Sequence, residues 1–293
     1  MRQSIKKQQG LTFIELMIAM LLGLVIIYAV ANIMVSNNQT ATIAETAAQA
    51  QDNGRFAMSY LSRRILRAGY MPDMPVVPPQ PFADLCDDNN QLGQYGMCSE
   101  NQNNDGQGEE STGDKLAIVR TADDNLSCFG TQLREDAGAG APVTTEPRVV
   151  DVFWVEESNN ISSLYCQTFA QQPATLASTN ALSSKQPIVA GIAAMHILYG
   201  IATQDQNSVQ RRVSRYVAPE QLPNRTANNF EKNWQQVEAV KVAILTEAFD
   251  EMRGLSGDRS YILLDSAPYT YSDQIIRQVF STTIARANFG GAQ

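Results

Sequence analysis

GLTFIELMIAMLLGLVIIYAVANIMV, residues 10–35, is the stretch that decides the fold of this 293-residue chain. Behind Gly10 the stretch is almost wholly apolar, and Glu15 is its single charged residue. As a helix, residues 11–35 reach roughly 37 Å, which is enough to cross a bilayer with some tilt. The sequence therefore predicts a transmembrane helix at the start of the chain.

The charges around this run predict its orientation. Three basic residues precede it: Arg2, Lys6 and Lys7. No basic residue follows until Arg55, so the positive-inside rule places the N-terminus in the cytoplasm and the rest of the chain outside it. A cleavable secretory signal would have a shorter apolar core that ends at the cleavage site, whereas here the polar-to-apolar boundary lies before the core. A simple signal anchor explains the length of the run but not Glu15, because a carboxylate is costly inside an apolar segment.

The N-terminal motif resembles a known family. Gly10-Leu11-Thr12-Phe13-Ile14-Glu15-Leu16 is similar to the class III signal of type IV prepilins and of type II secretion pseudopilins. The resemblance implies that a prepilin peptidase cuts between Gly10 and Leu11 and that the new N-terminus is methylated. It also implies that Glu15 pairs with the Leu11 amine of a neighbouring subunit. Leu11 stands where the family usually has phenylalanine.

The next segment, residues 36–69, continues the helix. It has no proline, and small or apolar residues recur at spacings of three and four: Ile43, Ala47, Ala50, Gly54, Ala57, Leu61, Ile65 and Ala68. This spacing predicts one apolar face of a helix that packs on a sheet. Pro72 and the prolines that follow it predict the end of the helix near residue 68. Gly54 is expected to weaken the helix by about 1 kcal/mol relative to alanine.

The remainder of the chain is predicted to be a loop region followed by a β-rich head. Residues 70–114 are rich in Asn, Asp, Gly and Pro and predict loops, and residues 115–293 contain runs rich in β-branched and aromatic residues. These strand-like runs cover residues 115–120, 148–156, 163–168, 196–202, 239–247 and 278–286. One long helix followed by mainly antiparallel strands predicts an α+β fold of the type IV pilin kind.

The four cysteines predict disulfides in an oxidising compartment. They are Cys86, Cys98, Cys128 and Cys166. No CxxC pair is present and the only histidine, His196, is distant in the sequence, which argues against a metal site. Four cysteines allow three pairings. We favour Cys86–Cys98 with Cys128–Cys166, and the sequence alone leaves the other two pairings open.

Charge and composition argue against nucleic-acid binding and catalysis. The formal net charge is −8 overall, and −11 for residues 11–293, so the head should repel phosphate backbones. Two arginine clusters are interpreted as solvated faces and internal ion pairs: Arg63, Arg64 and Arg67, and Arg211, Arg212 and Arg215. His196 lies in a strand-like run and is interpreted as structural rather than as a catalytic base. We therefore expect no enzyme activity, no cofactor and no metal.

Blocks along the whole chain resemble one branch of the pilin superfamily, the PilW-type minor pilins. They lie at residues 53–57, 61–63 and 68–70 of the helix, at 113–120 in the first strand, at 197–201 and 234–242, and at 279–285 in the last strand. Arg64 departs from the family pattern, in which an acid is expected at that position. The resemblance implies a minor pilin that helps to start type IV pilus assembly and enters or caps the filament tip. The implied location is the inner membrane with the head in the periplasm, and later the pilus at the cell surface.

The same resemblance implies a set of partners. They are the prepilin peptidase, the inner-membrane assembly platform, the major pilin, other minor pilins and a tip adhesin. Two other interpretations stay open: a type II secretion pseudopilin, and a membrane-tethered adhesin or enzyme that uses the helix only as an anchor.

Overall fold

The protein is described from a computed structural model. It describes residues 12–72, 80–83, 99, 112–133, 148–170, 181–202, 212–223, 233–251 and 257–288. The chain forms two units, residues 1–47 and residues 48–293, and each is described by itself. The first helix, α1 (Phe13–Leu66), contributes to both units.

Helix α1 is 54 residues long, and its bounds agree with the prediction to within two residues. It begins after Thr12, whose carbonyl oxygen accepts hydrogen bonds from the N–H groups of Glu15 and Leu16. It ends before the prolines because Gly69 takes a left-handed φ of +72°. The Gly69 N–H donates to the carbonyl oxygen of Val119, 2.8 Å away, so the chain leaves the helix already hydrogen-bonded to the first strand.

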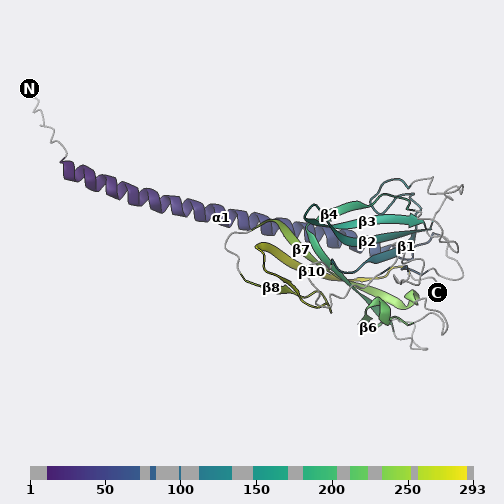
Figure 1. The fold of residues 1–293 in the computed structure, drawn as a ribbon. Coiled ribbons are helices and arrows are strands. Elements are labelled where there is room, and N and C mark those ends of the chain that lie inside the picture. The colour runs from purple at the N-terminus through teal and green to yellow at the C-terminus, as the bar shows by residue number, and fades with distance from the viewer. Residues whose placement is uncertain are drawn as a thin grey trace, which may run out of the picture. The chain divides into compact units, whose positions relative to one another are not determined.

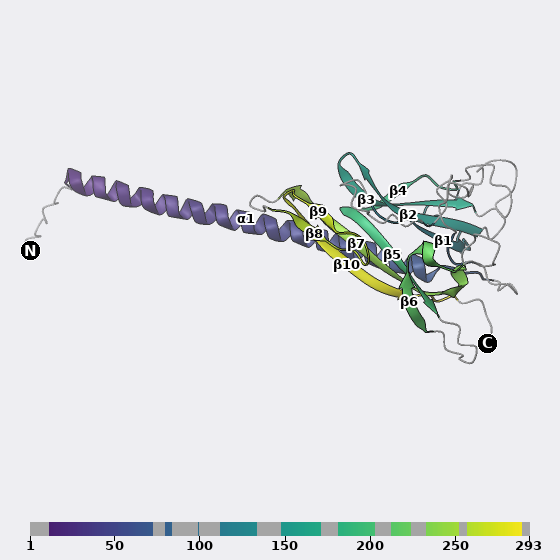
Figure 2. The same cartoon turned by 60° about the horizontal axis from the view of Figure 1, so that its bottom comes forward.

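The second unit is built on two four-stranded antiparallel sheets and a short hairpin (Figure 1). Sheet 1 has the order β1 (Leu116–Thr121), β2 (Arg148–Ser158), β3 (Ile161–Ala170), β4 (Gln186–Ala190). Sheet 2 has the order β10 (Ile275–Ala285), β7 (Val237–Glu251), β5 (Ile192–Ala202), β6 (Val213–Val217). The hairpin pairs β8 (Arg259–Tyr261) with β9 (Tyr269–Tyr271), as Figure 2 shows, and two 3-10 turns cover Pro219–Gln221 and Trp234–Gln236. The predicted α+β class is confirmed.

The second half of α1 packs its predicted face into the core of this unit. Ala57, Leu61, Ile65 and Ala68 are buried together with residues of both sheets, among them Phe153 of β2 and Val242 of β7. Small residues on this face let the strands come close: a Cβ on Gly54 would lie 2.4 Å from the ring of Phe280 in β10. The neighbouring Asn53 side chain donates to the carbonyl oxygen of Ala190 in β4, 3.1 Å away. The Asn53-Gly54 pair therefore fits α1 against both sheets.

A buried polar contact joins the two sheets. Gly113 pairs with Met195 of β5 in a parallel bridge, and the Asp114 carboxylate accepts a hydrogen bond from the Ile197 N–H at 2.7 Å. His196 Nδ1 lies 3.3 Å from the same carboxylate, and both side chains are almost fully buried. This burial in the middle of sheet 2 agrees with the structural interpretation of His196.

The strand predictions were correct in place but incomplete. All six predicted runs overlap observed strands, and four strands were missed: β4, β6, β8 and β9. The missed strands have three to five residues each, too few to show a period-two pattern, and β4 also contains Pro187.

Candidate functional site

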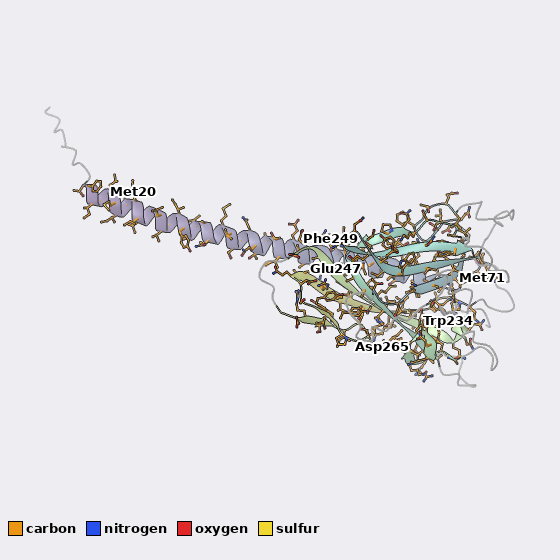
Figure 3. The ribbon with its side chains drawn as sticks, viewed as in Figure 1. Met20, Met71, Trp234, Glu247, Phe249 and Asp265 are labelled. Carbon is orange, nitrogen blue, oxygen red and sulfur yellow. A yellow bond between two sulfur atoms is a disulfide. The ribbon has the colours of Figure 1, made fainter. Side chains whose placement is uncertain are left out.

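The first unit offers a long apolar surface. Helix α1 is long and apolar enough to cross a membrane, and its most apolar 18-residue stretch has no residue buried within the molecule. Its large side chains, such as Met20 (63% exposed), project outward around the helix (Figure 3). A surface of this kind needs lipid or other apolar helices around it.

Glu15 lies in the first turn of this apolar surface. It is the only charged residue between Thr12 and Glu45. The Thr12 hydroxyl donates to its carboxylate over a long 3.4 Å, and no ion pair is found for it among the described residues. The helix N-terminus favours a negative charge there, but an apolar environment would still demand a cation close by. Gly10 and Leu11, the predicted cleavage residues, lie outside the described residues.

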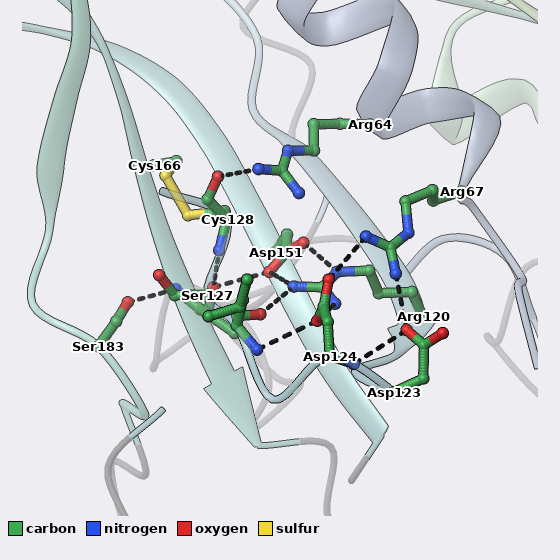
Figure 4. A network of polar contacts seen from close by, with 12 residues as sticks. Arg64, Arg67, Arg120, Asp123, Asp124, Ser127, Cys128, Asp151, Cys166 and Ser183 are labelled. Atoms are coloured by element: carbon green, nitrogen blue, oxygen red, sulfur yellow. Dashed lines mark hydrogen bonds and ion pairs between the residues drawn. A yellow bond between two sulfur atoms is a disulfide. The ribbon is translucent and has the colours of Figure 1, made fainter. Parts of the chain in front are cut away.

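The second unit carries a buried polar network next to the C-terminal end of α1 (Figure 4). Arg120 of β1 and Asp151 of β2 are both 1% exposed and form an ion pair of 2.6 Å. Arg120 also donates to the carbonyl oxygen of Leu126 at 2.7 Å, and the Thr168 hydroxyl donates to Asp151 at 2.7 Å. Because every buried charge has polar partners, the network can fix the position of the 122–133 loop against the sheet.

The Cys128–Cys166 disulfide belongs to the same network. It joins the 122–133 loop to the middle of β3, with the two Cα atoms 6.3 Å apart. The Cys128 N–H donates to Thr168 Oγ1, while its carbonyl oxygen accepts from Tyr60 and from Arg64, both in α1. Burial raises the pKa of Tyr60, and the adjacent Arg64 cation offsets part of that rise. The disulfide thus anchors α1 as well as the loop. Cys86 and Cys98 lie outside the described residues.

The first arginine cluster has internal partners. Arg67 pairs with Asp123 at 2.8 Å and with Asp124 at 3.1 Å, and Arg63 donates to the Ser59 hydroxyl at 2.6 Å. Together with the Arg64 contact, these interactions agree with the interpretation of internal pairing. Arg211, in the second cluster, lies outside the described residues.

A second polar cluster holds the β8–β9 hairpin to sheet 2. Arg277 of β10 pairs with Asp273 at 2.7 Å and with Glu247 at 3.2 Å, and its guanidinium carbon lies 3.5 Å from the ring centre of Tyr271. Arg259 of β8 also reaches Asp273, at 3.3 Å. Sequence reasoning missed this cluster and the Arg120–Asp151 pair. Arg120 and Asp151 are far apart in the chain, as are Glu247 and Arg277, whereas Asp273 and Arg277 are close in the chain but carry no motif.

Two carboxylates in these clusters are expected to make the stability of the head sensitive to acid. Burial alone would raise the pKa of Asp124 and of Asp273, but both pKa values lie below the ordinary 3.8. The pKa of Asp124 is lowered by the hydrogen bond from the Leu126 N–H and by Arg67, and the pKa of Asp273 is lowered mainly by the hydrogen bond from Arg277. A carboxyl group whose pKa is lower in the folded state stabilises the fold above its unfolded pKa, and this contribution is lost as the pH falls through the folded pKa.

We therefore expect the midpoint of thermal unfolding to fall as the pH is lowered below about 4. Each ion pair is partly exposed, so each contributes no more than about 1 kcal/mol. Asp273→Asn should flatten the dependence of the midpoint on pH in this range, whereas Asp265→Asn, at an exposed position, should leave it unchanged. Equal slopes for the two variants and the parent would contradict this assignment.

The polar side chains of the head thus serve to hold elements together. Within the described ranges, no group of three or more His, Cys, Asp or Glu residues could hold a metal ion. Trp234 is buried in the core, and the partly buried Trp154 packs against a second apolar cluster and stacks on Tyr165, so both act as packing residues. The best candidates for a binding surface are the exposed apolar side chains of α1 and the carboxylate of Glu15.

Two known family models match parts of the chain. A model of the type IV pilus-assembly protein W family matches residues 152–288, from within β2 to beyond the end of β10. A model of the prokaryotic N-terminal methylation motif matches residues 5–30, which include Glu15. No curated protein and no solved structure matches the chain.

Proposed function

Because the chain belongs to the PilW-type pilins and carries the prepilin methylation motif, we propose that it is a minor pilin that helps to initiate type IV pilus assembly. In this role it enters the filament at its tip or caps it. As a pilin it is a structural, membrane-anchored protein that works with other pilus components and is a substrate of the prepilin peptidase.

The observation that carries the proposal is the position of Glu15. It is one carboxylate in the first turn of a helix whose apolar side chains are otherwise uncovered. Cleavage between Gly10 and Leu11 creates an amine at the same end of the mature helix. In a bundle of such helices, the Glu15 carboxylate of one subunit and the Leu11 amine of the next neutralise each other. An unpaired charge there is costly, so this pair selects one axial register between neighbours.

The proposed route follows the topology. The prepilin waits in the inner membrane with its N-terminus in the cytoplasm and its head in the periplasm. The apolar helix then leaves the lipid for the helices of other minor pilins and of the major pilin at the assembly platform. A tip adhesin is a further partner of the head. The match to the pilus-assembly family, rather than to a secretion family, favours the pilus over the type II secretion role.

Replacing Glu15 with valine tests the proposal. We expect Glu15→Val to insert in the membrane normally but to be at least about tenfold depleted from sheared pili, the factor that corresponds to ~1.4 kcal/mol of lost pairing. Glu45→Val removes an exposed acid from the same helix beyond the apolar segment and serves as the matched control. Quantitative immunoblotting of membranes and pili gives the measurement, and mass spectrometry of the mature N-terminus checks that it begins at Leu11.

The proposal fails if Glu15→Val and Glu45→Val reach the pili equally. It also fails if the protein in cells keeps residues 1–10. Deletion of the gene distinguishes a role in the type IV pilus from a role in type II secretion. A pilus role predicts loss of surface pili, and a secretion role predicts loss of exported proteins.

A further inference from the structure

Two neighbouring arginines near the C-terminal end of α1 are held in place by neutral groups. Arg64 donates to the carbonyl oxygen of Cys128 at 2.5 Å (Figure 4), and its guanidinium carbon lies 5.1 Å from the ring centre of Tyr60. Arg63 donates to the Ser59 hydroxyl at 2.6 Å. Neither arginine forms an ion pair with any residue that the structure describes. Their side chains are therefore positioned while their positive charges stay unneutralised.

The lack of a carboxylate partner distinguishes these two arginines from others close by. Arg67, one turn further along the helix, pairs with two aspartates, and Arg120 pairs with Asp151. Arg63 is exposed and Arg64 is half-buried, so a partner molecule can reach both. A guanidinium group has five N–H donors, and the contacts described leave further donors free on each side chain. A guanidinium that is already positioned loses little entropy when it binds a carboxylate through two parallel hydrogen bonds.

Aromatic side chains lie beside the two charges. Phe56 stacks on Tyr60 with the ring centres 6.2 Å apart, and Phe56 is 49% exposed. Positions 56, 60 and 63 follow one another at spacings of four and three, which places them on one flank of the helix. The Tyr60 hydroxyl donates to the Cys128 carbonyl oxygen, and the next residue, Phe129, is 47% exposed. We define the arginine–aromatic surface by the following residues: Phe56, Tyr60, Arg63, Arg64 and Phe129.

The composition of the arginine–aromatic surface is that of a protein-binding site. Aromatic residues and arginine are enriched in protein interfaces, and tyrosine and arginine are frequent among the residues that dominate binding energy. The charge indicates the chemistry of the partner, because complementary potentials face each other across an interface. Two unneutralised cations beside apolar rings fit carboxylates that lie next to apolar side chains.

We propose that the arginine–aromatic surface binds a carboxylate-bearing segment of a different pilus protein. The carboxylates of this segment pair with Arg63 and Arg64, and its apolar side chains pack on Phe56 and Phe129. The inference rests on the proposed function, since it names the chemistry by which the head meets another pilus component.

A second copy of this chain is a poorer partner. In a symmetric pair of copies the same patch meets itself, so Arg63 and Arg64 would face the same arginines without any carboxylate from the described residues to offset the repulsion. Head-to-tail contact would bring together heads with a net charge of −11 each for residues 11–293, and a net charge so far from zero opposes self-association.

Nucleic acid is also a poorer partner. Its phosphates could pair with the arginines and its bases could stack on the rings. The net charge of −11 nevertheless repels a phosphate backbone along the rest of the head. A protein segment with a few local carboxylates does not meet this long-range repulsion.

Carbodiimide crosslinking of assembled pili tests the pairing directly. The reagent joins an amine to a carboxylate that lies within ion-pair distance, so Arg63→Lys and Arg64→Lys supply the amine in the full chain. We expect each variant to give a crosslink, absent from the parent, to an aspartate or glutamate of one other pilus protein, identified by mass spectrometry. Arg67→Lys should crosslink within the chain to its acidic partners and is the positive control. Arg55→Lys, at an exposed position on the same helix, is the negative control.

Three results of the crosslinking overturn the proposal. The first is a crosslink from Arg63→Lys and Arg64→Lys to a second copy of the chain. The second is an equal yield of the same product from Arg55→Lys. The third is the absence of any crosslink to another protein while Arg67→Lys gives its product within the chain.

Neutral variants give an independent readout. Arg63→Gln with Arg64→Gln removes two charges from the surface, and Arg55→Gln with Arg215→Gln removes two charges from exposed positions elsewhere. We expect the first variant to be about tenfold depleted from sheared pili and the second to match the parent. Thermal unfolding checks the fold. If the first variant is destabilised, Arg63→Gln alone replaces it, because that side chain contacts only the exposed Ser59 hydroxyl.

The same assay separates this proposal from the proposed function. If the neutral variant of the arginine–aromatic surface enters pili as well as the parent while Glu15→Val does not, the docking proposal fails and the pilin proposal stands. Binding of the parent head to DNA that is lost in the neutral variant would also overturn the docking proposal.

Discussion

Asp151→Ala is expected to lower the free energy of unfolding of the head by about 3–5 kcal/mol, because the buried Arg120 loses its carboxylate partner at 2.6 Å and keeps only the partly exposed carboxylate of Asp124, 3.7 Å away. Both side chains of the pair are 1% exposed, so water cannot replace the lost carboxylate. The substitution also removes the acceptor of the Thr168 hydroxyl, and Thr168 in turn accepts from the Cys128 N–H. A loss of this size is a large part of the 5–15 kcal/mol that ordinary domains possess.

Denaturant unfolding of the detergent-solubilised full chain, with the disulfide intact, measures the effect. The informative control is the double variant Arg120→Met with Asp151→Leu, which removes both charges and fills the space with apolar atoms. We expect it to be much closer to the parent than Asp151→Ala, since a buried pair can often be replaced by apolar residues at little cost. If the single and double variants were equally unstable, shape rather than charge would explain the result.

Gly113→Ala is the second substitution with a large expected effect. Gly113 has a φ of +90°, and a Cβ there would lie 2.0 Å from the carbonyl oxygen of Met195. That oxygen accepts the Asp114 N–H hydrogen bond that joins the two sheets, so relief of the clash must break the junction. We expect a loss of about 3 kcal/mol or more, from backbone strain together with the lost hydrogen bonds.

Gly130 offers a matched control for Gly113→Ala. It has the same φ of +90°, and a Cβ there would meet nothing within 4 Å among the described residues. Gly130→Ala should therefore cost only the backbone strain, of about 1–2 kcal/mol. The difference in unfolding midpoint between Gly113→Ala and Gly130→Ala measures the cost of the clash with the Met195 carbonyl oxygen. Equal losses of stability in the two variants would contradict the role given to Met195.

Local patterns were enough to predict most elements of the fold. The face of α1 from Ala50 to Ala68 is buried as its spacing predicts, because helical periodicity reports burial directly. The six longest strands were found from their composition. The prediction for Gly54 was incomplete: the glycine was treated as a weak point of the helix, whereas it gives room to the ring of Phe280. That contact joins residues more than 200 positions apart, and no local pattern reports it.

The sequence by itself determined that one end of this protein is an apolar helix with a single acidic residue in its first turn, because hydropathy and charge can be read from residues that are neighbours in the chain. It also determined a helix-plus-strand head. Tertiary structure alone decided that the long strands form two four-stranded sheets and that Arg120 is paired with Asp151. The physical reason is that strand register and buried ion pairs are contacts between residues far apart in the sequence. Such contacts form only when the folded chain brings the two segments together, so no local pattern reports them.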